Sequence, residues 1–318
     1  MTIKEAASWL DSHDNYLILT HRRPDGDTLG CAAALAAGLN EHGKTAFILY
    51  NPEITERYNS IVGMFWAADD FVPDHIITVD IAAVDLFPVG GEKYSENVSL
   101  CIDHHPSNTG YSKNTCLVSS CASCGEIVYE LLMELGDGIS DITAAALYIA
   151  LSTDTGCFAY TNTTGNTLRV ASLLADAGAP IAYINKKFFR TKTKSRILLE
   201  GMIISGLEFY LDNAVAISSI SLDMLNATGA DEQDMEDIAS IPGVIEGVVI
   251  GITIRELGVR KCKFSVRSTA RANSNELCAK FGGGGHAMAA GCTIEKPLAE
   301  AKKLFLEAIN QKYPDGHI

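Results

Sequence analysis

Short hydrophobic runs alternate with longer helical patterns along the first half of the chain. This alternation is typical of strand–helix units that form a parallel sheet covered by helices. The hydrophobic runs predict buried strands over residues 16–20, 46–50, 75–80 and 98–103. The helical patterns cover residues 28–39, 123–135, 141–152 and 167–177, and Asp141 is the expected N-cap of the third helix.

The pattern changes near residue 182. A basic amphipathic stretch over residues 186–204 predicts a connecting helix. Strand patterns then follow over residues 206–210, 214–221, 247–256 and 261–268, and helical patterns over 273–281 and 299–311. The length of 318 residues suits two domains. We therefore expect an N-terminal α/β domain with a parallel sheet (residues 1–182), a linker helix (183–206) and a smaller C-terminal α/β domain (207–318).

The net charge is −14, from 25 Lys and Arg against 39 Asp and Glu. Such an acidic chain is not expected to hold long duplex DNA through many phosphate contacts. Basic residues are nevertheless concentrated in two stretches. Residues 186–196 carry six of them and no acidic residue, and residues 255–280 carry seven against two. Each stretch could bind a polyanion locally, or could simply be a solvated charged face.

The first residues lack the basic and apolar segments of a signal peptide. No apolar stretch reaches the roughly 18 residues needed to cross a bilayer, so we expect no membrane partner. The cysteines number nine and show no regular spacing, which favours reduced thiols. These features predict a cytoplasmic protein, and a homodimer is compatible with them.

Acidic and histidine residues gather where predicted elements end. They are His21, Asp25 and Asp27 after the first strand, Asp80 at the end of the third, Asp103, His104 and His105 at the end of the fourth, and Asp154 after the helix over 141–152. The carboxyl ends of parallel strands meet at one edge of a sheet, where ligands bind. One Asp at a strand end is usually a turn residue, but this ordered set predicts a single crevice.

The side chains of His21, Asp25, Asp27, Asp80, His104 and Asp154 offer two imidazoles and four carboxylates without a thiolate. This donor set suits Mg²⁺ or Mn²⁺, and the imidazoles favour Mn²⁺. Four crowded carboxylates repel one another, and two divalent metal ions would neutralise them. A pair of ions about 3.5–4 Å apart can activate water and stabilise displacement at phosphorus. We therefore predict a two-metal phosphoesterase.

A glycine cluster, FGGGGHAMAAG, begins at Phe281. It lacks the GK[ST] ending of a P-loop, but consecutive glycines let a backbone approach a phosphate closely. A flexible turn is the alternative. Arg255 and Arg267 lie on predicted strands that lead to the cluster, with Ser268 and Asn275 nearby as hydrogen-bonding candidates. Arg267 is the preferred phosphate ligand, whereas Arg255 could equally form a structural ion pair.

HRRPDGD at 21–27, the strand-terminal Asp80, DHH at 103–105 and STDTG at 152–156 closely resemble the motifs of the DHH phosphoesterase superfamily. The glycine cluster resembles the GGGH motif of its DHH-associated domain. This resemblance implies that His21 and Asp25 bind one metal, that Asp27, His104 and Asp154 bind the other, and that Asp80 bridges both. It also implies that His105 faces the phosphate, that Asp103 orients a histidine ligand, and that Gly283, Gly284, Gly285 and His286 hold the substrate. Ala287 and Met288 depart from the polar residues common at those positions.

The resemblance implies Mn²⁺-dependent cleavage of short oligoribonucleotides to nucleoside monophosphates, and removal of the 3′-phosphate from 3′-phosphoadenosine-5′-phosphate (pAp). Phosphodiester hydrolysis of cyclic or linear dinucleotides such as c-di-AMP and pGpG is the alternative. A RecJ-like exonuclease fits the short acidic chain less well, and a pyrophosphatase of the superfamily would lack the glycine motif. A non-catalytic single-strand-binding protein would lack metal ligands, and an alanyl-tRNA-related module would explain only the second half.

Overall fold

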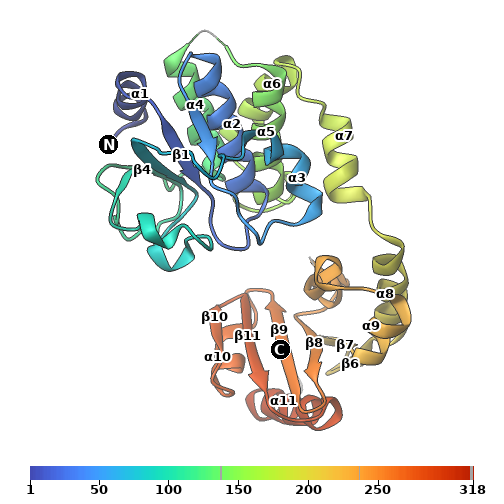
Figure 1. Cartoon of the computed structure of the whole chain (residues 1–318). Coiled ribbons are helices and arrows are strands. Elements are labelled where there is room, and N and C mark those ends of the chain that lie inside the picture. Colours follow the sequence, from blue (N-terminus) through green and yellow to red (C-terminus); the bar gives the residue numbers. More distant parts are fainter. Residues whose placement is uncertain (137, 236, 316–317) are drawn as a thin grey trace. The chain divides into compact units, whose positions relative to one another are not determined.

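The computed structural model describes residues 1–136, 138–235, 237–315 and 318. It divides into two compact units, Met1–Thr191 and Lys192–Ile318 (Figure 1). Each unit contains hydrophobic clusters of its own. We therefore describe the two units separately.

The first unit contains a parallel sheet in the strand order β2-β1-β3-β4-β5, as the alternating pattern predicts. Its strands are β1 (Tyr16–Leu19), β2 (Ala46–Ile48), β3 (His75–Val79), β4 (Val98–Asp103) and β5 (Thr115–Leu117). Tyr16 and Ile18 pack with the helices, whereas Leu17 and Leu19 pack with Ile76 and neighbouring loop residues on the other face. Burial on both faces explains why these strands are continuous hydrophobic runs.

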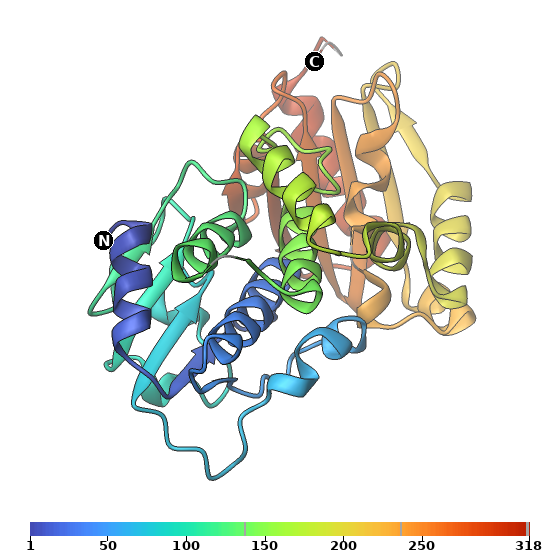
Figure 2. The ribbon, with the colours of Figure 1, turned by 90° about the horizontal axis from the view of Figure 1, so that it is seen from above.

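The helices of the first unit occupy the segments before, between and after the strands (Figure 2). They are α1 (Ile3–Ser12), α2 (Gly26–Glu41), α3 (Glu56–Val62), α4 (Cys124–Leu135), α5 (Asp141–Asp154), α6 (Gly165–Asp176) and α7 (Ile181–Asn185). Single turns of 3₁₀-helix form η1 (Gly63–Phe65), η2 (Val84–Leu86) and η3 (Glu92–Tyr94). The N-cap of α5 is Ser140, which accepts a hydrogen bond from the Thr143 amide, so the prediction of Asp141 as the cap is wrong by one residue.

Helix α2 is buried almost all round because its small residues admit other helices closely. A Cβ on Gly30 would lie 2.5 Å from the Ala146 carbonyl oxygen of α5. A Cβ on Gly26 would lie 2.3 Å from the Thr153 hydroxyl of the same helix. The Ala-rich pattern therefore serves helix–helix packing, and it brings the first turn of α2 against the last turn of α5.

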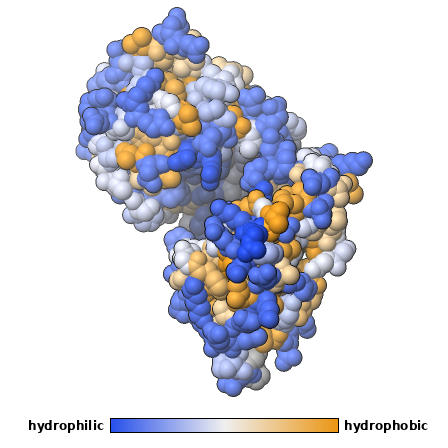
Figure 3. Space-filling view, turned by 60° about the horizontal axis from the view of Figure 1, so that its bottom comes forward, coloured by the Kyte–Doolittle hydropathy of each residue, from blue (hydrophilic) through white to orange (hydrophobic). Residues whose placement is uncertain are grey.

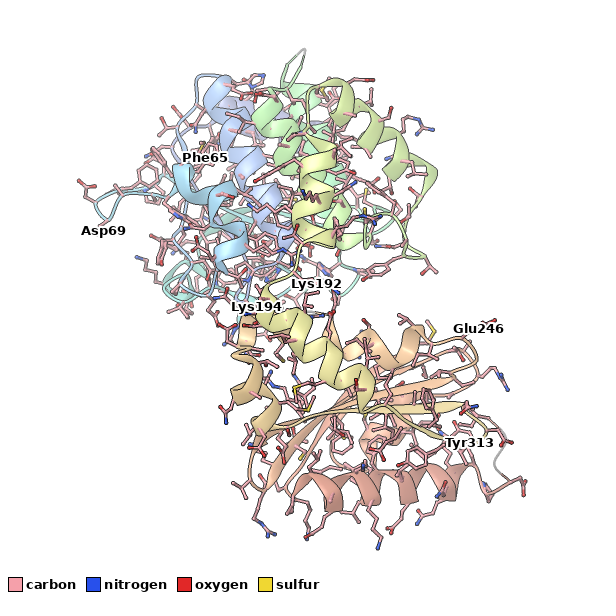
Figure 4. All side chains as sticks on the ribbon, turned by 90° about the vertical axis from the view of Figure 1, so that its right-hand side faces the viewer. Phe65, Asp69, Lys192, Lys194, Glu246 and Tyr313 are labelled. Atoms are coloured by element: carbon pink, nitrogen blue, oxygen red, sulfur yellow. The ribbon has the colours of Figure 1, made fainter. Side chains whose placement is uncertain are left out.

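The predicted linker helix over 183–206 is interrupted in the structure. After α7, a π-helical turn forms η4 (Lys186–Arg190), and α8 (Lys194–Ser205) begins only after the extended Thr191 and Thr193. The Thr193 side chain caps α8 by accepting a hydrogen bond from the Arg196 amide. A capping threonine within the basic stretch thus starts a new helix, between the labelled Lys192 and Lys194 (Figure 4).

The second unit contains a mixed sheet in the order β10-β11-β9-β8-β7-β6. Its strands are β6 (Glu208–Tyr210), β7 (Val215–Ile220), β8 (Ile250–Gly258), β9 (Lys261–Ser268), β10 (Gly284–His286) and β11 (Ala289–Ile294). Strands β7 and β8 pair in parallel and the other neighbours are antiparallel. The unit also contains α9 (Leu222–Thr228), η5 (Glu232–Met235), η6 (Ile238–Val244), α10 (Ser274–Ala279) and α11 (Leu298–Lys312).

The glycine cluster is an edge strand of this sheet, not only a loop. Strand β10 pairs with β11 across the two-residue turn Ala287-Met288, with Gly285 opposite Ala290. A Cβ on Gly283 would lie 2.2 Å from the Gly291 carbonyl oxygen, and one on Gly285 would lie 2.5 Å from that of Ala289. These two glycines are therefore needed for the close approach of the two strands.

Hydrophilic residues cover most of the face seen in Figure 3, with hydrophobic residues scattered between them. Hydrophobic side chains scattered singly on a surface are ordinary in folded proteins. Within the described residues, no helix combines the length and the apolar character needed to cross a membrane.

Candidate metal centre

The predicted acidic and histidine residues of the first unit come together at the carboxyl edge of its sheet. His21 follows β1, Asp80 follows β3, and Asp103 ends β4. Asp25 is the N-cap of α2, where its carboxylate accepts hydrogen bonds from the Asp27 and Thr28 amides. Asp154 is the last residue of α5 instead of lying beyond it, because that helix runs two residues further than predicted.

One group of ligand atoms consists of His21, Asp25 and Asp80, all within 4.8 Å of one another. The His21 Nε2 atom lies 3.5 Å from an Asp25 oxygen and 3.8 Å from the Asp80 Oδ2 atom. Asp80 is buried, whereas 58% of the Asp25 side chain is exposed. This group therefore opens towards solvent on the Asp25 side.

A second group consists of Asp27, His104 and Asp154, again within 4.8 Å. The His104 Nε2 atom lies 3.7 Å from Asp27, 3.8 Å from Asp154 and 3.4 Å from the Asp80 Oδ1 atom. The two Asp80 oxygens thus approach one histidine from each group. The Oδ1 atom is buried and has no hydrogen-bond partner in the described part of the chain. A buried carboxylate oxygen aimed at other ligand atoms fits a cation, since an unpaired buried oxygen is otherwise costly.

Backbone carbonyls set the ring orientation of both candidate histidine ligands. The His21 Nδ1 atom lies 2.7 Å from the Arg22 carbonyl oxygen, and the His104 Nδ1 atom lies 3.2 Å from that of Cys121. A proton on each Nδ1 leaves each Nε2 lone pair free for a metal. The donor atoms present therefore fit divalent cations.

Asp27 also connects the site to helix α4, which sequence reasoning did not predict. Its carboxylate accepts hydrogen bonds from the Ser123 hydroxyl at 2.8 Å and from the Cys124 and Gly125 amides at 2.8 and 3.2 Å. These donors lie at the N-terminus of α4, where amides and the helix dipole favour an anion. The sequence did contain a signal for this contact, because a helix is predicted to start at Ser123.

His105 and Asp103 form a pair beside the two groups, and the His105 Nδ1 atom also lies 3.4 Å from the Asp80 Oδ1 atom, so that Asp80, His104 and His105 form a third cluster of candidate ligand atoms. The buried Asp103 carboxylate accepts a hydrogen bond from His105 Nδ1 at 2.8 Å and another from the Asn108 side chain at 2.6 Å. Asp103 thus orients His105, whose side chain is 42% exposed, and its Oδ1 atom also accepts a hydrogen bond from the backbone amide of His104 at 2.8 Å. The hydrogen bond to Asp103 raises the pKa of His105, which favours the protonated ring.

Burial raises the pKa of three carboxyl groups, and neighbouring carboxylates reinforce this effect. The pKa of Asp80 is well above its ordinary value, that of Asp27 is raised, and that of Asp154 is raised to about 7. Burial opposes protonation of His21, but its contact with Asp25 outweighs this and raises its pKa to about 9. Without cations, the cluster is therefore stabilised by holding protons.

This protonation predicts how the stability of the metal-free protein depends on pH. The stabilisation from a raised carboxyl pKa is present below the ordinary value of 3.8 and is lost as pH rises through the folded value, about 7 for Asp154. We expect the Tm of chelator-treated protein to fall between pH 5 and about 8, and added Mn²⁺ to raise it most at the upper end. Asp154→Asn should flatten the metal-free profile in differential scanning fluorimetry. An unchanged slope in that variant would show that Asp154 does not titrate in this range.

In the second unit, the structure pairs Arg255 with an acidic residue. Its guanidinium donates two hydrogen bonds to Glu232, at 3.1 and 2.7 Å. Arg255 therefore forms a structural ion pair, which was the alternative to phosphate binding in the sequence analysis. Glu232 is remote in sequence, so pattern reasoning could not identify the partner.

Arg267 and His286 lie in one cross-strand row of the second sheet. Arg267 on β9 is opposite Ala289 on β11, which is opposite His286 on β10. Directly opposed residues of antiparallel strands share a face, so Arg267 and His286 flank the small Ala289. Both are exposed. The row offers a cation and an imidazole on either side of an open position.

The remaining predicted residues lie around this row. The Ser268 hydroxyl donates hydrogen bonds to the Ala272 and Ala287 carbonyls, so it ties down the turn that follows β10. Asn275 on α10 has its side-chain oxygen 3.7 Å from the position of a Cβ on Gly284. The half-buried Asn275 therefore lies beside Gly284 of the edge strand.

A model of the N-terminal domain of the DHH family matches residues 15–151, and a model of the DHHA1 domain matches residues 212–314. The chain therefore contains a DHH domain and a DHHA1 domain, which confirms the resemblance carried by its motifs.

The chain is similar to the bifunctional oligoribonuclease and PAP phosphatase NrnA of Thermus thermophilus, with 28% identity covering 93% of this chain and 89% of the relative. It is also similar to the enzyme of the same name in Bacillus subtilis, with 25% identity covering 89% of this chain and 90% of the relative. The fold also resembles the crystal structure of an exopolyphosphatase-related protein from Bacteroides fragilis, with a TM-score of 0.87, 25% identity, and coverage of 99% and 97%.

Proposed function

We propose that this protein is a two-metal phosphohydrolase that cleaves short oligoribonucleotides to nucleoside monophosphates and removes the 3′-phosphate of pAp. The observation that carries the proposal is the Asp80 carboxylate, whose two oxygens face His21 and His104 from separate ligand groups. The substrate class is supported by the two similar oligoribonuclease and PAP phosphatase enzymes, each aligned over most of both chains.

In this proposal, His21, Asp25 and Asp80 hold one cation, and Asp27, His104, Asp154 and Asp80 hold the other. Two divalent ions balance the four carboxylates, and the two imidazoles favour Mn²⁺. When bound, such a pair of ions would lower the pKa of the attacking water and stabilise the charge that develops at phosphorus. The Ser123 hydroxyl and the Cys124 and Gly125 amides orient Asp27 and favour its ionised form for this role.

His105 then acts on the phosphate. Asp103 holds the Nδ1 atom, which leaves the Nε2 atom of a protonated ring to donate a hydrogen bond to a phosphate oxygen or a proton to the leaving oxygen. Asn108 keeps the Asp103 carboxylate in place from its other oxygen. The pair therefore orients a donor without itself binding a cation.

The second unit would hold the rest of the substrate. Arg267 and His286 would bind a phosphate from either side of Ala289, and Asn275 would reach it past Gly284. Ser268 and the glycines Gly283 and Gly285 would maintain the backbone that presents these groups. Arg255, bound to Glu232, would contribute only if substrate displaces that ion pair.

Residues 1–182 would thus form the catalytic domain and 207–318 the substrate-binding domain. The free cysteines support a cytoplasmic location.

The test is hydrolysis of a labelled diribonucleotide and of pAp by protein loaded with Mn²⁺, compared with chelator-treated protein. We expect nucleoside monophosphates from the first substrate, AMP and phosphate from the second, and loss of both activities without metal. Parallel kcat/KM values for pGpG and c-di-AMP decide between this function and signalling-dinucleotide hydrolysis. Failure of folded, metal-loaded protein to hydrolyse the diribonucleotide or pAp would refute the proposal.

Arg267→Ala is expected to raise the KM for pAp by about tenfold with a smaller change in kcat, because a charge-assisted phosphate contact is lost while the metal ligands remain. Metal content should equal that of the wild type. Arg260→Ala removes another exposed arginine of the same unit, outside the row, and serves as the matched control. Equal KM values for the Arg267→Ala variant and the wild type would exclude Arg267 as a substrate ligand.

A further inference from the structure

A pocket of about 460 Å³ lies in the first unit beyond the end of β2. This volume falls within the roughly 300–1,000 Å³ that is typical of small-molecule sites. Its lining includes Tyr50, Ile54, Thr55, Glu56, Asn59 and Trp66. They come from the segment between β2 and α3, from α3 itself, and from the end of η1. None of them belongs to the metal centre.

The pocket adjoins the strand end that carries His21. Strands β1 and β2 pair in parallel up to Ile18 opposite Ile48, and the Leu49 amide donates a hydrogen bond to the Ile18 carbonyl, so Tyr50 directly follows the paired end of β2. Neighbouring strands are about 4.8 Å apart. Asn51 connects the two segments because its side chain donates hydrogen bonds to the Thr20 hydroxyl and to the His21 carbonyl, at 3.1 and 2.9 Å. The pocket therefore begins one strand away from a candidate metal ligand and is tied to it.

Two aromatic rings form one wall of the pocket. Tyr50 and Trp66 contact each other edge to face, with ring centroids 5.4 Å apart, and the Tyr50 side chain is 56% exposed. Trp66 is held against the sheet edge because Ala67 donates a hydrogen bond to the Ile48 carbonyl. In Figure 4 the labelled Phe65 lies against the body of the unit and Asp69 stands at the tip of the following loop. An exposed Tyr50 ring beside the half-buried Trp66 offers an aromatic face to a planar ligand.

The other side of the pocket is polar. Thr55, Glu56 and Asn59 lie on or next to α3 and offer a hydroxyl, a carboxylate and an amide. Ile54 adds an apolar surface. An amide can pair with the adjacent donor and acceptor of a base edge, as asparagine does with adenine. An aromatic wall facing hydrogen-bonding groups has the chemistry of a nucleobase site.

We propose that this pocket binds the nucleobase of the substrate nucleotide whose phosphate reaches the metal centre. The exposed Tyr50 ring provides the stacking face with Trp66 nearly perpendicular beside it, and Asn59 with Glu56 contacts the base edge. This proposal rests on the proposed function, because it assigns a further subsite to the same substrate. It implies that the first unit recognises the base as well as the phosphate.

Binding can be measured without turnover, because the chain has only two tryptophans, Trp9 and Trp66. In a Trp9→Phe background with Mg²⁺, titration with AMP should quench the fluorescence of Trp66, whereas ribose 5-phosphate, which lacks a base, should not. Tyr50→Ala should weaken AMP binding by about tenfold, and Tyr50→Phe should retain it because the stacking ring remains. Tyr183→Ala removes a tyrosine that is 63% exposed on α7 and is the matched control.

The same variants distinguish this inference from the proposed function. Tyr50→Ala should raise the KM for the diribonucleotide by about tenfold, and Tyr183→Ala should leave it unchanged. Hydrolysis by the wild type without AMP-dependent quenching, or with equal effects of AMP and ribose 5-phosphate, would overturn the base site and leave the hydrolase standing. Base-dependent quenching without any hydrolysis would instead reject the proposed function.

Discussion

Asp80→Asn is expected to lower kcat for diribonucleotide hydrolysis by about 10³-fold or more, because one carboxylate serves both ligand groups. Asparagine is the informative replacement. Asp80 has a backbone φ of 60°, a left-handed conformation that asparagine tolerates and alanine does not. Calorimetric titration with Mn²⁺ should show fewer than two bound ions per chain. Retention of two ions together with normal turnover would show that Asp80 is not shared.

The stability of the same variant should change in the opposite direction. Asp80 is buried, its Oδ1 atom has no partner within the described residues, and burial with nearby Asp27 and Asp25 raises its pKa. Removal of this charge should raise the free energy of unfolding of metal-free protein by about 0.5–2 kcal/mol at pH 8. Urea denaturation measures this change, and Asp69→Asn in an exposed loop is the matched control. A variant that is both less stable and inactive would indicate a folding defect instead.

The strands and helices that support the metal centre could be predicted because their signal is local. Strand β4 ends at Asp103 as expected, and β1, β2 and β3 end within two residues of their predicted ends, since each is a hydrophobic run followed by a polar residue. A parallel sheet then requires these strand ends to share an edge. The gathering of the ligand atoms therefore followed from pattern and topology together.

Features that depend on distant partners could not be predicted in this way. Strand β5 has three residues and is held by pairing with β4, so its own pattern is too short to recognise. The Arg255–Glu232 ion pair and the capping of α4 by Asp27 join residues far apart in the sequence. The pairing of β10 required glycines that, read alone, indicate a turn. In each case tertiary contacts outweigh local preference.

His105→Asn is expected to lower kcat by about 10²–10⁴-fold while the protein still binds two cations, because it removes a proton donor and no ligand of the two groups. The donor must be protonated, so activity should fall as pH rises through the pKa of His105, which the hydrogen bond to Asp103 raises above the ordinary value of 6.5. Metal content by mass spectrometry and the pH dependence of kcat measure the two parts of this prediction.

Asp103→Asn provides the decisive comparison. Its amide oxygen can still accept hydrogen bonds from the His104 and His105 backbone amides, as the Oδ1 atom does at 2.8 and 3.2 Å, so the turn should persist. The negative charge that favours protonated His105 is lost, so the alkaline limb of the kcat profile should move to lower pH. If kcat falls while the alkaline limb stays at the same pH, Asp103 only supports the turn and does not raise the pKa of His105. A shifted limb with normal metal content would instead establish the Asp103–His105 pair as the group that delivers the proton.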